Sequence, residues 1–368
     1  MKVCCVFNYN PLYRYPIYSA MAEKFDCDFF FGDTVFEPLK SFDANKLKGF
    51  KGFIEAKKTG IKGYIWHSNI SQIFNKKYTH YVLTGDYSMI VNWLIICYAK
   101  LFRRKVFLWC HGVKSEVKKK RTRLILHNFF TSVTGILMYN HYNCKYMEMI
   151  GCEKERLHVI HNSLNTPEQT RLYKELLPSN IYKDHFGNDY PVVIYIGRIQ
   201  KRMKVDMIIE AVKRLQKQNI LVNAVIVGSY MDGVDITQMV KEYKLEKQVW
   251  MYGPSFDENV NSELLYNADV CVAPGTVGLT AIHSLSYGTP CVTHSNHSAT
   301  GPEFEAIIDG CTGSFFVEDD IESLMESIKL WTNKTKQERE ETRAYARKEI
   351  ESNWSIDSQI SLLSKVLV

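Results

Sequence analysis

Residues 270–313 read VCVAPGTVGLTAIHSLSYGTPCVTHSNHSATGPEFEAIIDGCTG, and they are the most informative part of the chain for its fold. The stretch opens with four apolar residues and a proline-glycine turn, after which a helix can start at Gly278 and continue to Tyr287. A second turn leads into another apolar run that begins at Cys291. Strand, glycine turn, helix and strand form a βαβ unit, and its helix start presents backbone N–H groups and the positive end of a dipole. The pattern predicts a site for a phosphate at Gly278 to Thr280.

Short apolar runs of the same kind recur along the chain. They lie at residues 2–8, 29–31, 63–67, 80–83, 105–109, 192–196, 223–227 and 249–252. Such runs are typical of parallel strands that are covered on both faces. In the second half they alternate with helical patterns at residues 207–216, 237–244, 258–266, 321–332 and 337–353. The alternation predicts an α/β fold.

The composition sets the broad class of protein. The chain has 368 residues, 46% of them hydrophobic and 23% charged, which suggests two domains with full cores and excludes disorder. Polar residues interrupt the opening strand, so we expect no signal peptide and a cytoplasmic protein. The most apolar helical window, Met89 to Phe102, is too short to span a bilayer. Ten cysteines without a Cys-x-x-Cys pair indicate reduced thiols.

The charge is distributed unevenly between the two halves. Residues 1–165 carry a formal charge of +13 and residues 166–368 carry −7, which gives the net charge of +6. A basic half is suited to nucleic acid, an anionic membrane or a phosphorylated substrate. No nucleic-acid-binding motif accompanies it, so we expect no nucleic acid as a partner and keep the other two.

The strongest concentration of positive charge precedes an apolar stripe. It comprises Lys118, Lys119, Lys120, Arg121 and Arg123, and Leu124 to Phe130 follow. As one helix, this segment could lie on anionic headgroups at the inner face of the plasma membrane. It could equally pack its apolar face on the sheet and leave its basic end in solvent. Both interpretations stay open.

Asp26-Cys27-Asp28 has the form of a metal-binding Asp-x-Asp motif. The triplet opens a strand, however, and two carboxylates two residues apart on a strand are usually solvated edge residues. The sequence identifies no further oxygen ligands for Mg²⁺. We therefore expect no metal site.

The central stretch resembles the donor-site signature of the retaining family 4 glycosyltransferases. These enzymes have the GT-B fold and transfer a sugar from a nucleoside diphosphate. Gly278, Leu279 and Gly288 match the family pattern, whereas Gly275 and His283 stand where the family has its two glutamates. The resemblance implies two Rossmann-like domains facing an interdomain cleft, with the diphosphate on the backbone of residues 278–280. His283 could accept a bond from a ribose hydroxyl, although less well than a carboxylate.

The resemblance also assigns roles outside this stretch. Gly197-Arg198 matches the turn whose arginine neutralises the diphosphate leaving group, and Met203 stands at the position of the family's lysine. The neighbouring Lys204 is a candidate substitute. The remaining candidates are His111 beside the donor sugar, Glu305 in a Glu-x-Ile-x-x-Gly-like motif near the donor, and Arg14, which could reach a phosphate or the acceptor.

Domain boundaries follow from the polar segment 166–190, which contains Pro167 and Pro178 and suggests a linker. We expect an N-terminal acceptor-side domain at residues 1–165 and a C-terminal domain that binds the nucleotide sugar at residues 191–353. By resemblance, residues 354–368 form a helix that crosses back to the first domain.

The function implied by the resemblance is metal-independent transfer of a sugar with retention of configuration, without a cofactor other than the nucleotide sugar itself. The acceptor would be a glycan, for which we expect a polyprenyl diphosphate carrier, in the synthesis of a surface polysaccharide such as O-antigen, lipopolysaccharide or capsule. Two alternatives stay open. One is a nucleotide-sugar epimerase of the same fold, and the other is a catalytically degenerate module that only binds a sugar nucleotide.

Overall fold

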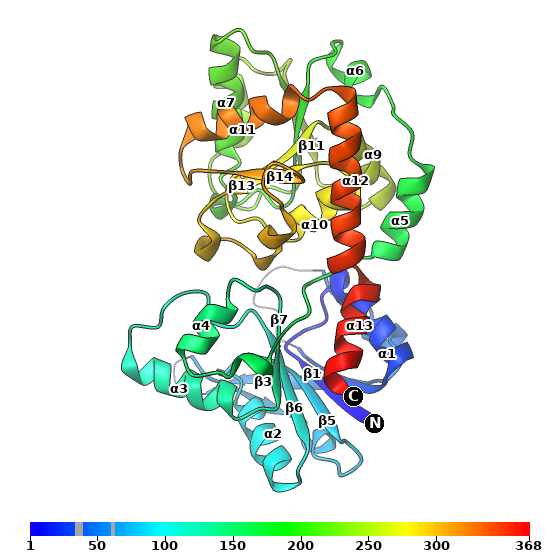
Figure 1. The fold of residues 1–368 in the computed structure, drawn as a ribbon, viewed down its shortest axis with the longest axis vertical. Helices are drawn as coiled ribbons and strands as arrows, with labels where there is room; N and C mark the ends of the chain where they lie inside the picture. The colour runs from blue at the N-terminus through cyan, green and yellow to red at the C-terminus, as the bar shows by residue number, and fades with distance from the viewer. Residues whose placement is uncertain (34–39, 60–62) are drawn as a thin grey trace. The chain divides into compact units, whose positions relative to one another are not determined.

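The computed structural model describes residues 1–33, 40–59 and 63–368. The chain divides into two compact units (Figure 1). The first comprises Met1–Asn165 and Ile356–Val368, and the second comprises Thr166–Ser355.

The first unit contains an eight-stranded sheet in the order β4-β3-β2-β1-β5-β6-β7-β8. All neighbouring strands are parallel except β3 and β4, which are antiparallel. Strand β1 pairs with β2 on one side and with β5 on the other, so the direction of winding reverses between β1 and β5. The strands are β1 (Lys2–Phe7), β2 (Asp26–Gly32), β3 (Phe50–Lys58), β4 (Ile65–Ser68), β5 (His80–Thr84), β6 (Lys105–Cys110), β7 (Gly135–Met138) and β8 (Leu157–Val159).

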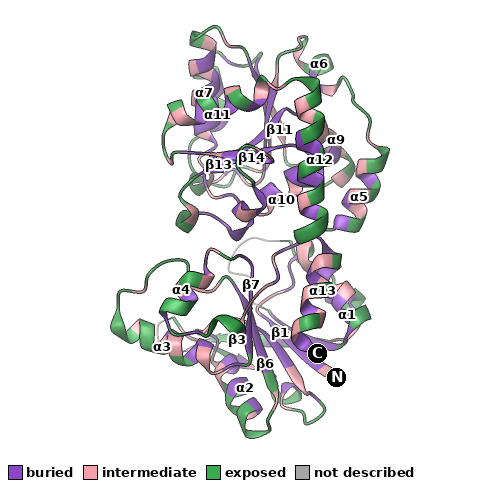
Figure 2. Cartoon of the chain, viewed as in Figure 1, coloured by how far each residue is buried: buried purple, intermediate pink, exposed green. Residues whose placement is uncertain are grey.

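Helices cover both faces of this sheet. Side chains alternate along β1, so that Val3 and Cys5 face one core and Cys4 and Val6 face the other. α1 (Tyr15–Lys24) and α13 (Ile356–Leu367) pack on the first face. α2 (Ile90–Leu101) and α3 (Lys120–Thr131) pack on the second, and α4 (Cys144–Met149) adds Met147 to the same core. Figure 2 shows the buried strands between helices whose outer sides are exposed.

The second unit contains a six-stranded parallel sheet in the order β11-β10-β9-β12-β13-β14. The winding reverses between β9 and β12, as it does between β1 and β5 in the first unit. The strands are β9 (Val192–Ile196), β10 (Asn223–Val227), β11 (Val249–Gly253), β12 (Val270–Ala273), β13 (Cys291–His294) and β14 (Gly313–Phe316). Both units therefore have the Rossmann-like arrangement, in which ligands bind at the carboxyl ends of the strands where the winding reverses.

The second unit also has helices on its sheet. From β9 onward they are α7 (Asp206–Lys217), α8 (Ile236–Glu242), α9 (Glu258–Asn267), α10 (Leu279–Ser286), α11 (Ile321–Thr332) and α12 (Lys336–Asn353). Helices α7, α8 and α11 contribute to the core on one face of the sheet. On α10, the last turn lies beside α12, where Arg347 donates to the carbonyl oxygen of Ser286 at 2.7 Å.

The segment 166–190, which its polarity suggests is a linker, contains two helices and belongs to the second unit. They are α5 (Thr166–Glu175) and α6 (Ile181–Phe186). The Tyr182 hydroxyl donates to the carbonyl oxygen of Leu264 on α9 at 2.5 Å. The prolines that suggested a linker therefore lie at the beginning of α5 and between α5 and α6.

The expectation that both carboxylates of Asp26-Cys27-Asp28 are solvated is wrong for Asp28, which is 1% exposed. Lys2 and Lys77 each place an ammonium nitrogen 2.8 Å from this carboxylate. The Tyr78 hydroxyl donates to it at 2.8 Å. Burial raises the pKa of Asp28, but these hydrogen bonds outweigh that effect and lower it to about 2. The carboxylate is thus part of a structural ion-pair cluster.

Candidate functional site

The predicted phosphate site lies at the carboxyl ends of β9 and β12, where the winding of the second sheet reverses. Gly197 and Arg198 follow β9 directly, and the loop after β12 leads into α10. The Thr280 hydroxyl donates to the carbonyl oxygen of Ile196 at 3.0 Å, so the start of α10 is fastened to the end of β9. Gly278 is the residue before the helix. The arrangement brings Arg198 and the positive end of α10 to the same edge of the sheet.

Gly275 is a glycine because another loop lies against its backbone. The Gly275 amide donates to the carbonyl oxygen of Met203 at 3.0 Å. A Cβ atom at position 275 would lie 2.1 Å from the carbonyl oxygen of Arg202. No glutamate fits there unless the loop at 201–204 moves. Two of the three positions at which the sequence departs from the family pattern, Met203 and Gly275, therefore contact each other directly.

Lys204 has a left-handed backbone, with φ of 50°, after the short helical turn Lys201–Met203. Its ammonium nitrogen lies 3.2 Å from a Glu318 oxygen and 2.5 Å from an Asp319 oxygen. Desolvation lowers the pKa of Lys204, but the two carboxylates outweigh this and raise it. The charge of Lys204 is thus shared with two acidic side chains, and its role at the diphosphate stays a prediction.

His283, at the position of the family's second glutamate, lies beside a carboxylate that the sequence analysis missed. Its Nε2 is 3.0 Å from Oε1 of Glu258, the first residue of α9. The Tyr287 hydroxyl donates to the same oxygen at 2.7 Å. Burial raises the pKa of Glu258, but His283, Tyr287 and Gln169 outweigh it and lower the pKa to about 2. The signal in the sequence was the acidic residue Glu258 at the start of the predicted helix 258–266, in the segment that follows the predicted strand 249–252.

Two further acidic residues lie on the helical turn Pro302–Ala306. Glu303 is 4% exposed. Its Oε2 would be 3.9 Å from a Cβ atom at Gly278 and 2.9 Å from one at Gly301. Glu305, the residue chosen from the sequence, is half-buried on the same turn. A buried carboxylate therefore lies beside the start of α10, where the helix dipole favours negative charge.

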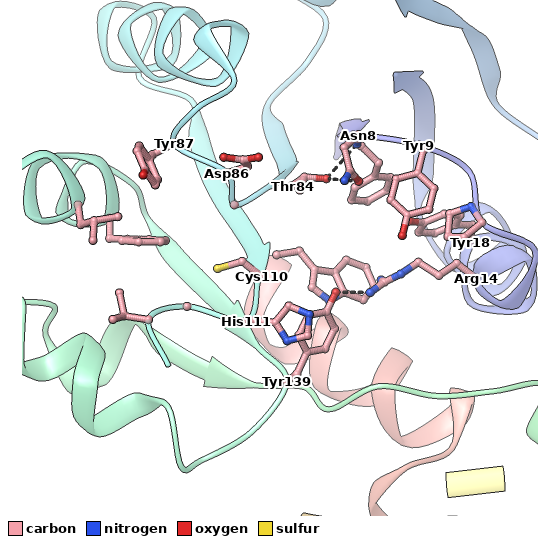
Figure 3. A pocket seen from close by; sticks show the side chains of 18 of the residues that line it. Asn8, Tyr9, Arg14, Tyr18, Thr84, Asp86, Tyr87, Cys110, His111 and Tyr139 are labelled. Atoms are coloured by element: carbon pink, nitrogen blue, oxygen red, sulfur yellow. Dashed lines mark hydrogen bonds between the residues drawn. The ribbon is translucent and has the colours of Figure 1, made fainter. Parts of the chain in front are cut away.

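The first unit has a pocket of about 360 Å³ at the carboxyl ends of β1, β5 and β6 (Figure 3). It lies where the winding reverses between β1 and β5, as expected for an open parallel sheet. Its volume is within the range of small-molecule sites. The polar and aromatic residues that line it include Asn8, Tyr9, Tyr13, Arg14, Thr84, Asp86, Tyr87, Trp109, His111 and Tyr139.

His111 and Arg14, two of the predicted site residues, both line this pocket. The His111 ring lies 4.6 Å from the ring of Tyr139, centroid to centroid. Its backbone carbonyl accepts from the Asn143 side-chain amide at 2.8 Å. Desolvation in the pocket wall lowers the pKa of His111, and the positive charges of Lys114 and Arg14 lower it further. The imidazole is therefore neutral at pH 7 and can exchange a hydrogen bond with a sugar hydroxyl.

Asp86 and Tyr87 are pocket residues that the sequence analysis missed. They follow β5, and the Asp86 carboxylate accepts from the backbone amide and the hydroxyl of Ser88 at 2.8 and 2.7 Å. The side-chain amide of Asn92 donates to the carbonyl oxygens of Thr84 and Asp86 at 2.8 and 2.9 Å and so holds this loop. The position of Asp86 just after a predicted strand was the available signal.

The basic cluster Lys118, Lys119, Lys120, Arg121 and Arg123 is exposed at the start of α3. The apolar stripe that follows is largely used inside the protein, because Leu126, Phe129 and Phe130 are buried in the core. Of the larger apolar side chains of α3, Leu124 is 60% exposed. The stripe thus packs on the sheet at these three residues, which agrees with the second of the two interpretations left open by the sequence.

Neither a metal centre nor a membrane span is found among the described residues. Within residues 1–33, 40–59 and 63–368, no three His, Cys, Asp or Glu side chains form a group that could hold a metal ion. Among the helices of the same ranges, none is both long and apolar enough to cross a membrane.

Comparison with known proteins supports the same fold. Residues 179–349 match the family model of glycosyl transferases group 1. The structure of Anabaena Alr3699/HepE in complex with UDP is similar, with a TM-score of 0.74 and 14% identity over 100% of this chain and 99% of that one. A glycosyltransferase from Rickettsia africae ESF-5 is similar with a TM-score of 0.73 and 13% identity. The lipopolysaccharide outer core galactosyltransferase WaaB is similar with a TM-score of 0.68 and 15% identity. Each comparison covers 100% of this chain and 99% of the other. No curated protein sequence matches the chain.

These similarities define the fold. The chain has the GT-B fold, with two Rossmann-like units, so the fold predicted from the sequence is confirmed. The match of residues 179–349 supports the glycosyltransferase class of enzyme within that fold.

Proposed function

We propose that this protein is a retaining glycosyltransferase that transfers a sugar from a nucleoside diphosphate sugar to a glycan acceptor. The observation that carries the proposal is the junction of β9 and α10, where the Thr280 hydroxyl holds the helix start against Ile196 and next to Gly197-Arg198. The family match covers this same part of the chain. Support for the donor comes from similar structures that contain UDP or UDP-glucose.

In the proposed mechanism, the second unit stabilises the leaving group. As the bond between the anomeric carbon and the diphosphate breaks, negative charge develops on the diphosphate oxygens. The first backbone amides of α10 and the guanidinium of Arg198 are arranged to accept that charge, which is electrostatic catalysis by fixed groups. We propose that Gly278, Leu279 and Thr280 bind the diphosphate and that no metal ion is needed.

The nucleoside side of the donor is assigned to α9 and α10. Glu258 offers a carboxylate and His283 an imidazole. We propose that these two side chains accept hydrogen bonds from the ribose hydroxyls, in place of the two glutamates of the family pattern. Glu303, Glu305 and Lys204 are proposed to surround the donor sugar and the diphosphate. On the first unit, His111 would orient the reacting sugar, and Arg14 would bind the acceptor.

The acceptor is proposed to be a glycan on a lipid diphosphate, used at the cytoplasmic face of a membrane to build a surface polysaccharide. The charge of +13 on residues 1–165 and the exposed cluster at 118–123 support an anionic acceptor or surface. One of the similar structures is that of a lipopolysaccharide outer core galactosyltransferase, which supports an acceptor that belongs to a surface polysaccharide.

A binding module without transfer activity is the second candidate. The backbone contact between Met203 and Gly275 favours it, because two side chains that the family uses at the donor are replaced together.

Ligand-observed NMR with UDP-, GDP-, CMP- and dTDP-sugars, with and without EDTA, tests the donor site. We expect selective binding of one donor that EDTA does not change. If none of these nucleotide sugars binds, the phosphate site at α10 is wrong.

A further inference from the structure

The pocket of the first unit holds an arginine whose charge no carboxylate of the described chain balances. Nη2 of Arg14 donates to the Tyr139 hydroxyl, and its Nε lies 3.5 Å from the hydroxyl of Tyr13. Within residues 1–33, 40–59 and 63–368, its third nitrogen, Nη1, has no protein acceptor, and no carboxylate lies within 4.0 Å of the guanidinium. Among the described residues, no carboxylate therefore balances the positive charge that Arg14 brings to the pocket.

Aromatic rings keep this charge in place. The guanidinium carbon lies 5.0 Å from the ring centroid of Trp109, 5.3 Å from that of Tyr139 and 5.6 Å from that of Tyr13. Each such cation–π contact attracts the guanidinium to the face of the ring. Desolvation lowers the pKa of Arg14, but the surrounding tyrosines outweigh it and raise the pKa. The side chain is thus held in its charged form.

The shape of the guanidinium decides what it can bind. Its N–H donors form a flat, fixed fork that matches the two oxygens of a carboxylate or a phosphate. The rings hold the fork on one side of the pocket, and the side chain lines the cavity. An ordered arginine of this kind is suited to an anionic group on the ligand.

A second polar group lies elsewhere in the pocket wall. Figure 3 shows Asp86 and Tyr87 on a different side of the pocket from Arg14. The Asp86 carboxylate accepts two bonds from Ser88 and retains further acceptor capacity, which suits sugar hydroxyls. The rings of Tyr9, Tyr13 and Tyr87 add flat apolar surfaces to the wall. The pocket therefore combines an anion site with a hydroxyl site.

We propose that this pocket binds a sugar that carries an anionic group, either a carboxylate or a phosphate ester, with Arg14 on the anion and Asp86 on the hydroxyls. This rests on the proposed function and names the class of its acceptor: an acidic or phosphorylated glycan. Discrimination against neutral sugars comes from the single charge at Arg14.

The test compares three sugars and inorganic phosphate by titration calorimetry on the full chain. Glucuronic acid and glucose 6-phosphate should bind about tenfold tighter than methyl glucoside, because hydrogen bonds between charged groups are stronger than those between neutral groups. The relative affinity of the first two identifies the anion. Arg14→Gln should bring the three sugars to within about threefold of each other. Arg103→Gln, which removes an exposed arginine of the same unit, should keep the preference.

Two results would overturn the proposal. They are equal binding of all three sugars by the wild-type chain, and a preference for anionic sugars that persists in Arg14→Gln. Inorganic phosphate that binds as tightly as glucose 6-phosphate would also overturn the proposal, because the sugar would then contribute nothing to the affinity.

Two further measurements keep the test decisive. If Arg14→Gln does not fold, Arg14→Lys and the salt dependence of the wild-type chain replace it. Salt should weaken binding of the anionic sugars and leave methyl glucoside unchanged, and equal salt effects would overturn the proposal. Donor binding is measured on the same samples, so a chain that binds acidic sugars but no nucleotide sugar contradicts the proposed function and not this pocket.

Discussion

At the scale of single residues, Arg198 is the side chain on which the proposed chemistry most depends. It follows β9 at the point where the start of α10 is fastened to the sheet. We expect Arg198→Ala to lower kcat by about 10²- to 10³-fold, as removal of one group that stabilises a developing anion does in other enzymes. Steady-state kinetics with the donor identified by NMR measure this. Arg171→Ala, an exposed arginine of α5, is the matched control and should keep full activity. Near-normal turnover in Arg198→Ala would remove Arg198 from the mechanism.

Position 275 shows how a backbone contact selects a residue. A Cβ atom there would lie 2.1 Å from a backbone oxygen of the loop at 201–204. We therefore expect Gly275→Ala to lower the free energy of unfolding by about 1–3 kcal/mol, because the loop must shift. Chemical denaturation measures the change. An alanine variant as stable as the wild-type chain would contradict the close approach of the two loops.

At the scale of elements, strand β2 depends on the ionised carboxylate of Asp28. Its pKa of about 2 is below the usual value, so the folded state is stabilised above about pH 4, and this stabilisation is lost as the pH falls toward 2. The pKa of Asp28 in the folded state is almost two units below its ordinary value, and this difference corresponds to about 2 kcal/mol of free energy of unfolding. Urea denaturation between pH 7 and pH 2 should show this loss in the wild-type chain and not in Asp28→Asn.

The neighbouring Asp26 provides a matched control for that experiment. Its side chain is 67% exposed, although it contacts the same Lys2 at 2.6 Å. Asp26→Asn should cost less than about 1 kcal/mol, because exposed ion pairs contribute little. Equal effects of the two substitutions would contradict the importance of burial.

For helix α3 the sequence left two roles open, membrane contact and packing on the sheet. The structure shows which of its residues a test of membrane contact has to change. With its apolar stripe in the core, membrane contact would depend on the charges of residues 118–123, which contribute about 1 kcal/mol each near an anionic surface. We expect the wild-type chain to co-sediment with phosphatidylserine vesicles at low salt. Replacing the five basic residues by glutamine should abolish this. If sedimentation persists after the replacement, the cluster is not the contact.

The sequence predicted the strands with continuous apolar runs well. The runs at 192–196 and 223–227 coincide with β9 and β10, and residues 321–332 form α11 as expected. Strand β3 was missed because glycine and lysine interrupt its apolar residues. Helices α5 and α6 were missed because their segment is polar and contains prolines, although the packing of Tyr182 on α9 stabilises it.

The sites were harder to predict than the fold. Motif matches led to Gly278, Arg198 and His111, since each follows a recognisable strand. Asp86 and Glu258 were missed because no motif marks a single carboxylate, and only the folded sheet shows which strand ends meet. Arg14 was found as a cation, but its setting among Trp109, Tyr13 and Tyr139 needed residues from three separate segments.

At the scale of the whole molecule, the two units differ in the chemistry that they offer. The first combines excess positive charge with a pocket that holds His111 and Arg14. The second combines a helix start with Arg198 and with carboxylates at Glu258 and Glu303. One unit is thus suited to an acceptor and the other to a donor, as the proposed transfer requires.

The most direct measurement follows the transfer itself. The nucleotide sugar identified by NMR is incubated with the protein, with EDTA, and with neutral and acidic glycan acceptors. Release of the nucleoside diphosphate and the anomeric configuration of the product are recorded by NMR. We predict release that requires an acceptor, persists in EDTA and gives a product with the configuration of the donor. A donor that binds without any release of nucleoside diphosphate would contradict the proposed transfer and identify the chain as a binding module.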